Sequence, residues 1–246
     1  MPSIVWNREP QEAMDNPYEY GAQEQFQKEA ERLTKELLVV LGERNGEFSL
    51  EETTSRKAVW MLFVDALVTC IDIVECLSVK RHRLVGKLLR DLDESIDLAF
   101  LFNTNSSAGD KLLTKWYNDE IIPHREYRKF IKSEIDDDLS KVLSELYSMM
   151  SKHAHGTYKV LLYSYILRGK KMLVHDSKYE SGILVHPKTI AMYYTLVAHY
   201  LKKLVNGLRT SGLIEENIIN SIWKSSLDEA TVPRRFEIKK KKGLDN

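Results

Sequence analysis

Residues 78–103 carry the pattern that most constrains the fold of this chain. Apolar side chains recur at helical spacing along one face of this stretch: Leu84, Val85, Leu88, Leu89, Leu92, Ile96 and Ala99. A charged stripe lies on the other face: Arg83, Lys87, Arg90, Glu94 and Asp97. The stripe is basic first and acidic last, which is the reverse of the order that a helix dipole favours. The pattern predicts one long helix that packs on others and indicates a use for its charged face.

The same helical periodicity recurs along most of the chain. Only 6 prolines and 11 glycines occur in 246 residues, so little interrupts long helices. We therefore predict an all-α fold, an up-and-down bundle of about seven helices. Two short alternating runs, at 172–175 and 183–186, predict a small β-hairpin or ordered loop near residues 171–186.

Turn signals and composition suggest one main domain. We expect an irregular segment at 1–22, the helical bundle at 23–212 and a short C-terminal helix within 213–232. The tail at 233–246 is basic and low in complexity, so we expect it to be mobile.

Charge and cysteine content limit the compartment and the partners. The net charge is zero, which does not favour whole-molecule attraction to nucleic acid. Cys70 and Cys76 fit neither a metal motif nor a disulfide framework, so we expect reduced thiols in a cytoplasmic protein. The apolar run at 58–77 includes Asp65 and Asp72, and charges in lipid are costly. We therefore expect a buried helix there and no membrane partner.

Several common active-site motifs do not occur in the sequence. It contains no GxxxxGK[ST], GxGxxG, GxSxG or HExxH, and no ExxH of the kind that builds di-iron bundles. His153 and His155 are two residues apart and point in different directions if the helix continues through both. We therefore expect no cofactor and no metal site.

The carboxylates of the 58–77 run need an explanation of their own. Asp65 and Asp72 share a helix face with Thr69 and Cys76. The favoured interpretation pairs them with the basic residues of the 78–103 helix, because buried charges are usually paired. The alternative is a functional acidic site.

The candidate catalytic residues are Arg90 and Glu94 in one helix and His153 and His155 near the end of another. Arg90 and Glu94 are four residues apart and face the same side. A histidine beside them can act as general acid or base, and an arginine can stabilise a pentavalent phosphate. That chemistry suffices for metal-independent RNA cleavage. The alternative is an intrahelical Arg90–Glu94 ion pair with His155 capping a helix end.

Two segments resemble the HEPN-like all-helical families, closest to abortive-infection and uncharacterised bacterial types. They are RxxxxGKLLRDLDES at 81–95 and LSELYSMMSKHAHG at 143–156. The resemblance covers roughly residues 55–210 and implies a helical bundle, frequent dimerisation, and ribonuclease or toxin activity in antiviral defence or toxin–antitoxin systems. The families' catalytic motif places an Arg four to six residues before a His. His155 matches that His, but Met149, Met150 and Ser151 occupy the window.

Three functional hypotheses follow, and the sequence leaves open whether the chain is an enzyme. The first is a HEPN-like ribonuclease that uses His155 and Arg90. The second is a non-catalytic helical module that binds a partner protein or a second copy through helix faces, with His155 buried and a large apolar patch exposed. The third is an RNA or other nucleic-acid binder using the basic tail and a cluster interleaved with aromatics. That cluster comprises Arg125, Arg128, Lys129 and Lys132.

Overall fold

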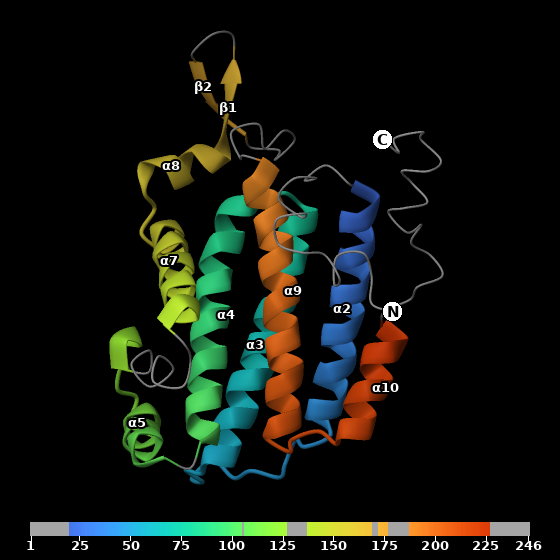
Figure 1. Ribbon diagram of the computed structural model, residues 1–246, viewed down its shortest axis with the longest axis vertical. Coiled ribbons are helices and arrows are strands. Elements are labelled where there is room, and N and C mark those ends of the chain that lie inside the picture. The colour runs from blue at the N-terminus through green and yellow to red at the C-terminus, as the bar shows by residue number, and fades with distance from the viewer. Residues whose placement is uncertain (1–19, 105, 127–136, 169–171, 177–186, 227–246) are drawn as a thin grey trace.

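The computed structural model of the chain describes residues 20–104, 106–126, 137–168, 172–176 and 187–226. The predicted fold class is confirmed, because these residues form an all-α bundle with one small hairpin (Figure 1). The predictions for the N-terminal segment up to residue 19 and for the basic tail at 233–246 fall outside the described residues.

Four long helices make the body of the molecule. They are α2 (Tyr20–Gly42), α3 (Ser55–Ser78), α4 (His82–Asn103) and α9 (Pro187–Thr210). Figure 1 shows α2, α4 and α9 running in one direction and α3 in the other, so α9 lies parallel to its neighbour α4. A parallel pair needs a long connection, and the chain between α4 and α9 supplies most of the smaller elements.

The smaller elements lie around this body. α10 (Glu216–Ser226) packs against α2, and α7 (Asp137–Ala154) packs antiparallel to α4. α5 (Ser107–Tyr117) follows α4 at the lower end of the bundle in Figure 1. At the opposite end, α8 (Tyr158–Leu161) and the 3-10 turn η1 (Leu162–Ser164) lead into a hairpin that projects away from the helices.

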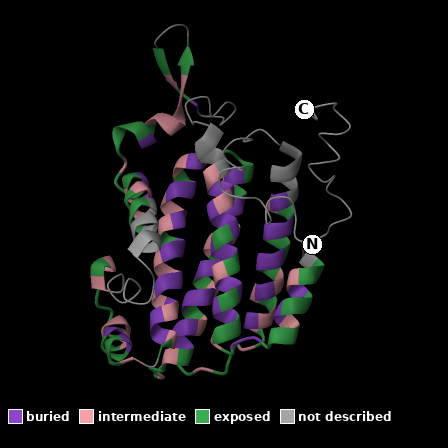
Figure 2. Cartoon of the chain, in the orientation of Figure 1, coloured by how far each residue is buried: buried purple, intermediate pink, exposed green. Residues whose placement is uncertain are grey.

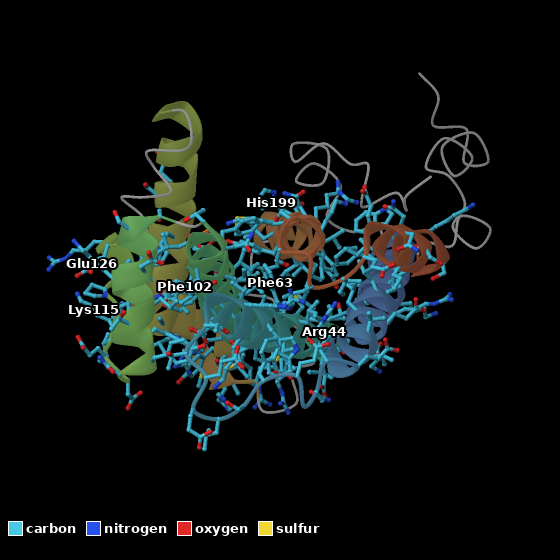
Figure 3. The ribbon with its side chains drawn as sticks, turned by 90° about the horizontal axis from the view of Figure 1, so that it is seen from below. Arg44, Phe63, Phe102, Lys115, Glu126 and His199 are labelled. Atoms are coloured by element: carbon cyan, nitrogen blue, oxygen red, sulfur yellow. The ribbon has the colours of Figure 1, made fainter. Side chains whose placement is uncertain are left out.

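Apolar stripes at helical spacing build the core, as predicted. From about Gln23 to Leu41 the sequence predicts a helix with an apolar stripe of five residues. In α2 all five are fully buried: Phe26, Ala30, Leu33, Leu37 and Leu41. Figure 2 shows buried residues on the inward faces of the long helices and exposed ones on their outer faces. On α4, Val85, Leu89 and Ile96 are fully buried, whereas Leu84 is exposed. Figure 3 shows Phe63 of α3 in the middle of the bundle.

The predicted helix start at Ser78 is wrong. Ser78 is the last residue of α3, and α4 begins four residues later at His82. Lys80 between them has φ 60°, and the amides of Lys80 and Arg81 donate to the carbonyls of Leu77 and Cys76. These two hydrogen bonds form a Schellman motif, with a lysine at the position that glycine usually occupies.

The sequence pattern predicts the next helix from about Asp110, with Pro123 stopping or kinking it, and this end is also wrong. α5 ends at Tyr117, and Asp119 (φ 59°) takes the left-handed position of a second such motif. Its start is earlier than predicted as well, because the hydroxyl of Ser106 accepts from the amide of Gly109 and caps the helix.

The hairpin prediction is correct for one strand and missed the other. β2 (Met172–His175) pairs antiparallel with β1 (Tyr165–Arg168), which lies in a stretch at 157–169 where the sequence pattern predicts helical or mixed structure. Tyr165–Arg168 is rich in aromatic and branched side chains that suit a strand. Only three residues separate it from β2, a common hairpin length. The other predicted strand, 183–186, lies outside the described residues.

None of the helices that the structure describes is long and apolar enough to cross a membrane. The apolar run at 58–77 lies in α3, in contact with α2, α4 and α9. Its cysteines are free thiols: Cys70 is buried, as predicted, and Cys76 is half-buried.

Candidate functional site

Arg90, Glu94 and Tyr147 form a polar group where α7 packs on α4. The guanidinium Nε of Arg90 donates to a carboxylate oxygen of Glu94 at 2.8 Å. The hydroxyl of Tyr147 donates to the same oxygen at 2.9 Å, and the Arg90 guanidinium lies 5.1 Å from the centre of the tyrosine ring. Burial, and then the hydrogen bond to Glu94, raise the pKa of Tyr147, so the phenol stays protonated.

His124 joins this group from the segment that follows α5. Its ring stacks on that of Tyr147, with centroids 3.4 Å apart and an interplanar angle of 7°. A turn closed by the Glu126 amide and the Pro123 carbonyl holds the segment, and Lys115 of α5 approaches Glu126 at 3.4 Å. Figure 3 shows Lys115 and Glu126 at the outer edge of the molecule, so this pair fixes the segment from the solvent side.

Two carboxylates of α4 point inward beside this group. Asp93 and Asp97 are each 1% exposed. The ammonium of Lys203 on α9 lies 2.7 Å from Oδ1 of Asp97. A ligating atom of His124 lies within 4.8 Å of one from each aspartate. The predicted charged stripe is therefore wrong at its acidic end, because Asp97 faces the interior between α4 and α9.

His153 is a core residue. It is 3% exposed, and its ring occupies the space where a side chain on Gly86 of α4 would be. Its Nε2 lies 3.3 Å from the hydroxyl of Tyr193, which is fully buried on α9. Burial lowers the pKa of His153, so the ring is neutral near pH 7. These contacts lock α7 onto α4 and α9.

His155 is exposed and directly follows the last residue of α7. Gly156 (φ 61°) ends the helix, with its amide and that of Thr157 donating to the carbonyls of His153 and Lys152. This end of α7 lies near Arg83, two turns or about 10 Å along α4 from Arg90. The structure thus brings Arg90 and Glu94 together, and no described contact joins His155 to either.

The other predicted site residues are only partly described. Arg125 is exposed next to His124. Arg128, Lys129 and Lys132 lie outside the described residues.

The carboxylates of α3 are on the surface. Asp65 and Asp72 are both exposed, and Asp65 accepts a hydrogen bond from Ser95 of α4 at 3.1 Å. Our prediction of buried carboxylates that need cationic partners is wrong, because this face of α3 turns outward.

A set of exposed apolar side chains gathers on α8 and the hairpin, which we call the hairpin surface. It holds five of the twelve large apolar side chains that are exposed among the described residues: Tyr158, Leu161, Leu167, Met172 and Leu173. Leu167 and Leu173 are directly opposite each other on one face of the hairpin, and Ile166 and Val174 are opposite each other on the other face. The two described strands are thus apolar on both sides.

No protein-family model matches this chain, and no curated protein and no solved structure matches it significantly. The HEPN-like resemblance therefore stays a prediction.

Sequence reasoning missed most of the polar group. By its spacing in the sequence Tyr147 belongs to the apolar face of its helix, and we predicted no role for Asp93, His124 or Lys203. The one available signal was the four-residue spacing of Asp93 and Asp97, which places both carboxylates on one face of α4.

Proposed function

We propose that this chain is a HEPN-like helical protein of a bacterial defence or toxin–antitoxin system, and that it works as a non-catalytic interaction module. It associates with a second copy of itself through the hairpin surface. Both cysteines are free thiols, which suits the reducing cytoplasm as its compartment.

The hairpin surface is the observation that supports this proposal. A lone two-stranded hairpin is at best marginally stable in water. This one projects from the end of the bundle (Figure 1), and Met172 on it is 69% exposed. A large apolar patch on a surface marks an interaction site, and the unpaired edge of a strand is a template for another strand. Twofold packing of two hairpins face to face would bury Leu167 and Leu173.

The state of the candidate catalytic residues also favours a binding role. Arg90 is held by Glu94, and His153 is a neutral core residue. His155 is exposed, whereas our hypothesis of a non-catalytic module predicted a buried His155, so the proposal rests on the apolar surface instead.

Sedimentation of the purified chain over a range of concentrations tests the proposal. We expect the wild type to be a dimer and a Leu167→Asp/Leu173→Asp variant to be a monomer with unchanged helical circular dichroism. Val39→Asp on α2 is the matched control, because Val39 is 68% exposed but lies outside the hairpin surface. A wild type that is monomeric throughout, or a control that dissociates equally, would refute the proposal.

A metal-independent ribonuclease is the second candidate, favoured because Arg90 and His124 both contact the ring of Tyr147. Arg90 is 24% exposed, so a phosphate can reach it. An imidazole stacked on the neighbouring tyrosine can accept the proton of a ribose 2′-OH. In this arrangement His124 takes the role that the sequence suggested for His155.

Induction of the chain in a bacterial host separates the two candidates. Wild type, Arg90→Ala, His124→Ala and His155→Ala are compared for growth and for intact total RNA. Toxicity and RNA cleavage that are lost in folded Arg90→Ala and His124→Ala variants would establish the nuclease. Loss in His155→Ala with full activity in His124→Ala would move the site to the end of α7. Equal growth and intact RNA in all four strains is the expectation for the interaction module.

A further inference from the structure

Three metal-ligating side chains lie close together, and one of them stacks on the ring of Tyr147. Asp93 and Asp97 come from successive turns of α4, and His124 comes from the segment after α5. Each offers one ligand atom, and the three atoms lie within 4.8 Å of one another. Because the carboxylates and the imidazole belong to different segments, the fold itself creates the convergence.

The burial of this group separates it from an ordinary acidic surface. Both aspartates are 1% exposed, while His124 is half-buried. Two neighbouring carboxylates in the interior are stable only with compensating positive charge. Lys203 supplies one positive charge at Oδ1 of Asp97. A divalent ion would supply two more and would enter from the side of His124.

The histidine ring is held in a suitable orientation. Stacking on Tyr147 at 3.4 Å occupies a face of the imidazole and fixes its plane. The nitrogen lone pairs lie in that plane, so stacking leaves them available to a ligand. Ligands of a tetrahedral ion at about 2.1 Å lie roughly 3.5 Å from each other. The ligand atoms would need to approach by about 1 Å or slightly more, which side-chain rotation can provide.

We propose that Asp93, Asp97 and His124 form a binding site for a divalent transition-metal ion, with Zn²⁺ and Mn²⁺ as the probes. Two carboxylates and one imidazole suit these ions, whereas Mg²⁺ and Ca²⁺ prefer sites made of oxygen alone. The ion would join α4 to the segment at 122–126. This proposal is independent of self-association through the hairpin surface.

Substitution of Lys203 tests the proposal by an expected rise in metal affinity, whereas substitution of a ligand tests it by an expected fall. Its ammonium already binds Oδ1 of Asp97, so an incoming ion must use the other oxygen or displace the ammonium. The two cations therefore compete for the carboxylate. Lys203→Met removes the competitor, and we expect it to raise metal affinity, whereas loss of any ligand lowers it.

The experiment is isothermal titration of the purified, chelator-treated full-length chain with ZnCl₂ and MnCl₂, and with MgCl₂ for comparison. We expect one ion per chain for Zn²⁺ or Mn²⁺ and weaker binding of Mg²⁺. Asp93→Asn and His124→Gln should each lower the affinity by at least the roughly 10- to 100-fold that loss of an outer-sphere partner costs. Circular dichroism and the unfolding temperature show whether each variant is folded.

Asp91→Asn is the matched control, because Asp91 is an exposed carboxylate on the same helix. It should bind the ion like wild type, with the same stoichiometry. The proposal would be overturned if wild type bound no ion. It would also be overturned if Asp93→Asn and His124→Gln bound the ion with the same affinity as wild type. Weaker binding in Lys203→Met would also contradict it, because the lysine would then not compete with the ion.

Discussion

Replacing Gly86 by alanine tests the packing of α7 on α4. Gly86 is in the interior of α4, where alanine would ordinarily favour the helix. Here the added Cβ would lie 2.2 Å from both Cγ and Nδ1 of His153. Carbon contacts are favourable only at about 3.5–4.0 Å, so the ring must withdraw by more than about 1 Å. The clash includes Cγ of His153, and rotation of the ring about the Cβ–Cγ bond leaves that atom in place.

The expected cost follows from two opposing terms. Overpacking of this kind costs about 1–3 kcal/mol, and the upper end applies because Tyr193 also holds His153 from the α9 side. The helix propensity of alanine returns about 1 kcal/mol. We therefore expect Gly86→Ala to lower the free energy of unfolding by about 2 kcal/mol, a fall of about 4–8 °C in the unfolding temperature.

The decisive assay is urea denaturation of Gly86→Ala in the wild-type and His153→Ala backgrounds. Without the imidazole the clash is gone, so Gly86→Ala should stabilise the His153→Ala chain by up to about 1 kcal/mol. Gly42→Ala is the control, because its Cβ would meet only Asn45 Nδ2, at an ordinary 3.6 Å. If Gly86→Ala has the same effect in both backgrounds, His153 does not pack on Gly86 as described.

Three further predictions concern charges and a helix end. Burial lowers the pKa of His82 to about 4. The stability that depends on this residue is therefore complete above pH 6.5 and falls by about 3 kcal/mol between pH 6.5 and 4, as the unfolded chain takes up a proton. Urea denaturation at pH 7.5 and 4.5 should show a smaller loss of stability for His82→Gln than for wild type. Lys203→Met leaves the carboxylate of Asp97 buried without its ammonium partner and should lower the free energy of unfolding by about 3 kcal/mol. The double variant Lys203→Met/Asp97→Asn should recover most of that loss. Equal stability of the single and double variants in thermal denaturation would contradict this. Lys80→Gly relieves a left-handed backbone (φ 60°) and should raise the free energy of unfolding by up to about 1 kcal/mol, whereas an unchanged urea midpoint would show that the lysine is not strained.

Apolar periodicity was enough to predict the bundle, because helix packing depends on which face is apolar. The stripe from Phe26 to Leu41 is completely buried, and Pro187, a residue type that suits the first position of a helix, begins α9. The hairpin was assigned only in part, because Tyr165–Arg168 carries a short apolar run that suits either a helix or a strand.

Glycine marks some of the helix ends in the sequence. The sequence pattern ends the last long helix at Gly207 or Gly212, and Gly212 has a positive φ just after α9. Gly156 has a positive φ near the end of α7. Lys80 and Asp119 adopt the same left-handed conformation, which costs a non-glycine residue about 1–2 kcal/mol. Tertiary packing of the flanking helices must offset that cost, and packing is not visible in a local pattern. The start of α4 and the end of α5 were therefore misplaced.

The buried carboxylates show where sequence reasoning stops. Asp93 and Asp97 lie beside Leu92 and Ile96 on α4, so the pattern alone places them at the margin of the apolar face. Whether a charged side chain at that margin faces water or the core depends on which groups of other elements pack against it. The ammonium of Lys203 is 106 positions from Asp97, and the imidazole of His124 comes from another segment. A carboxylate stays buried only where groups from other segments compensate for the loss of water. Its burial therefore depends on the completed fold and not on its own helix alone.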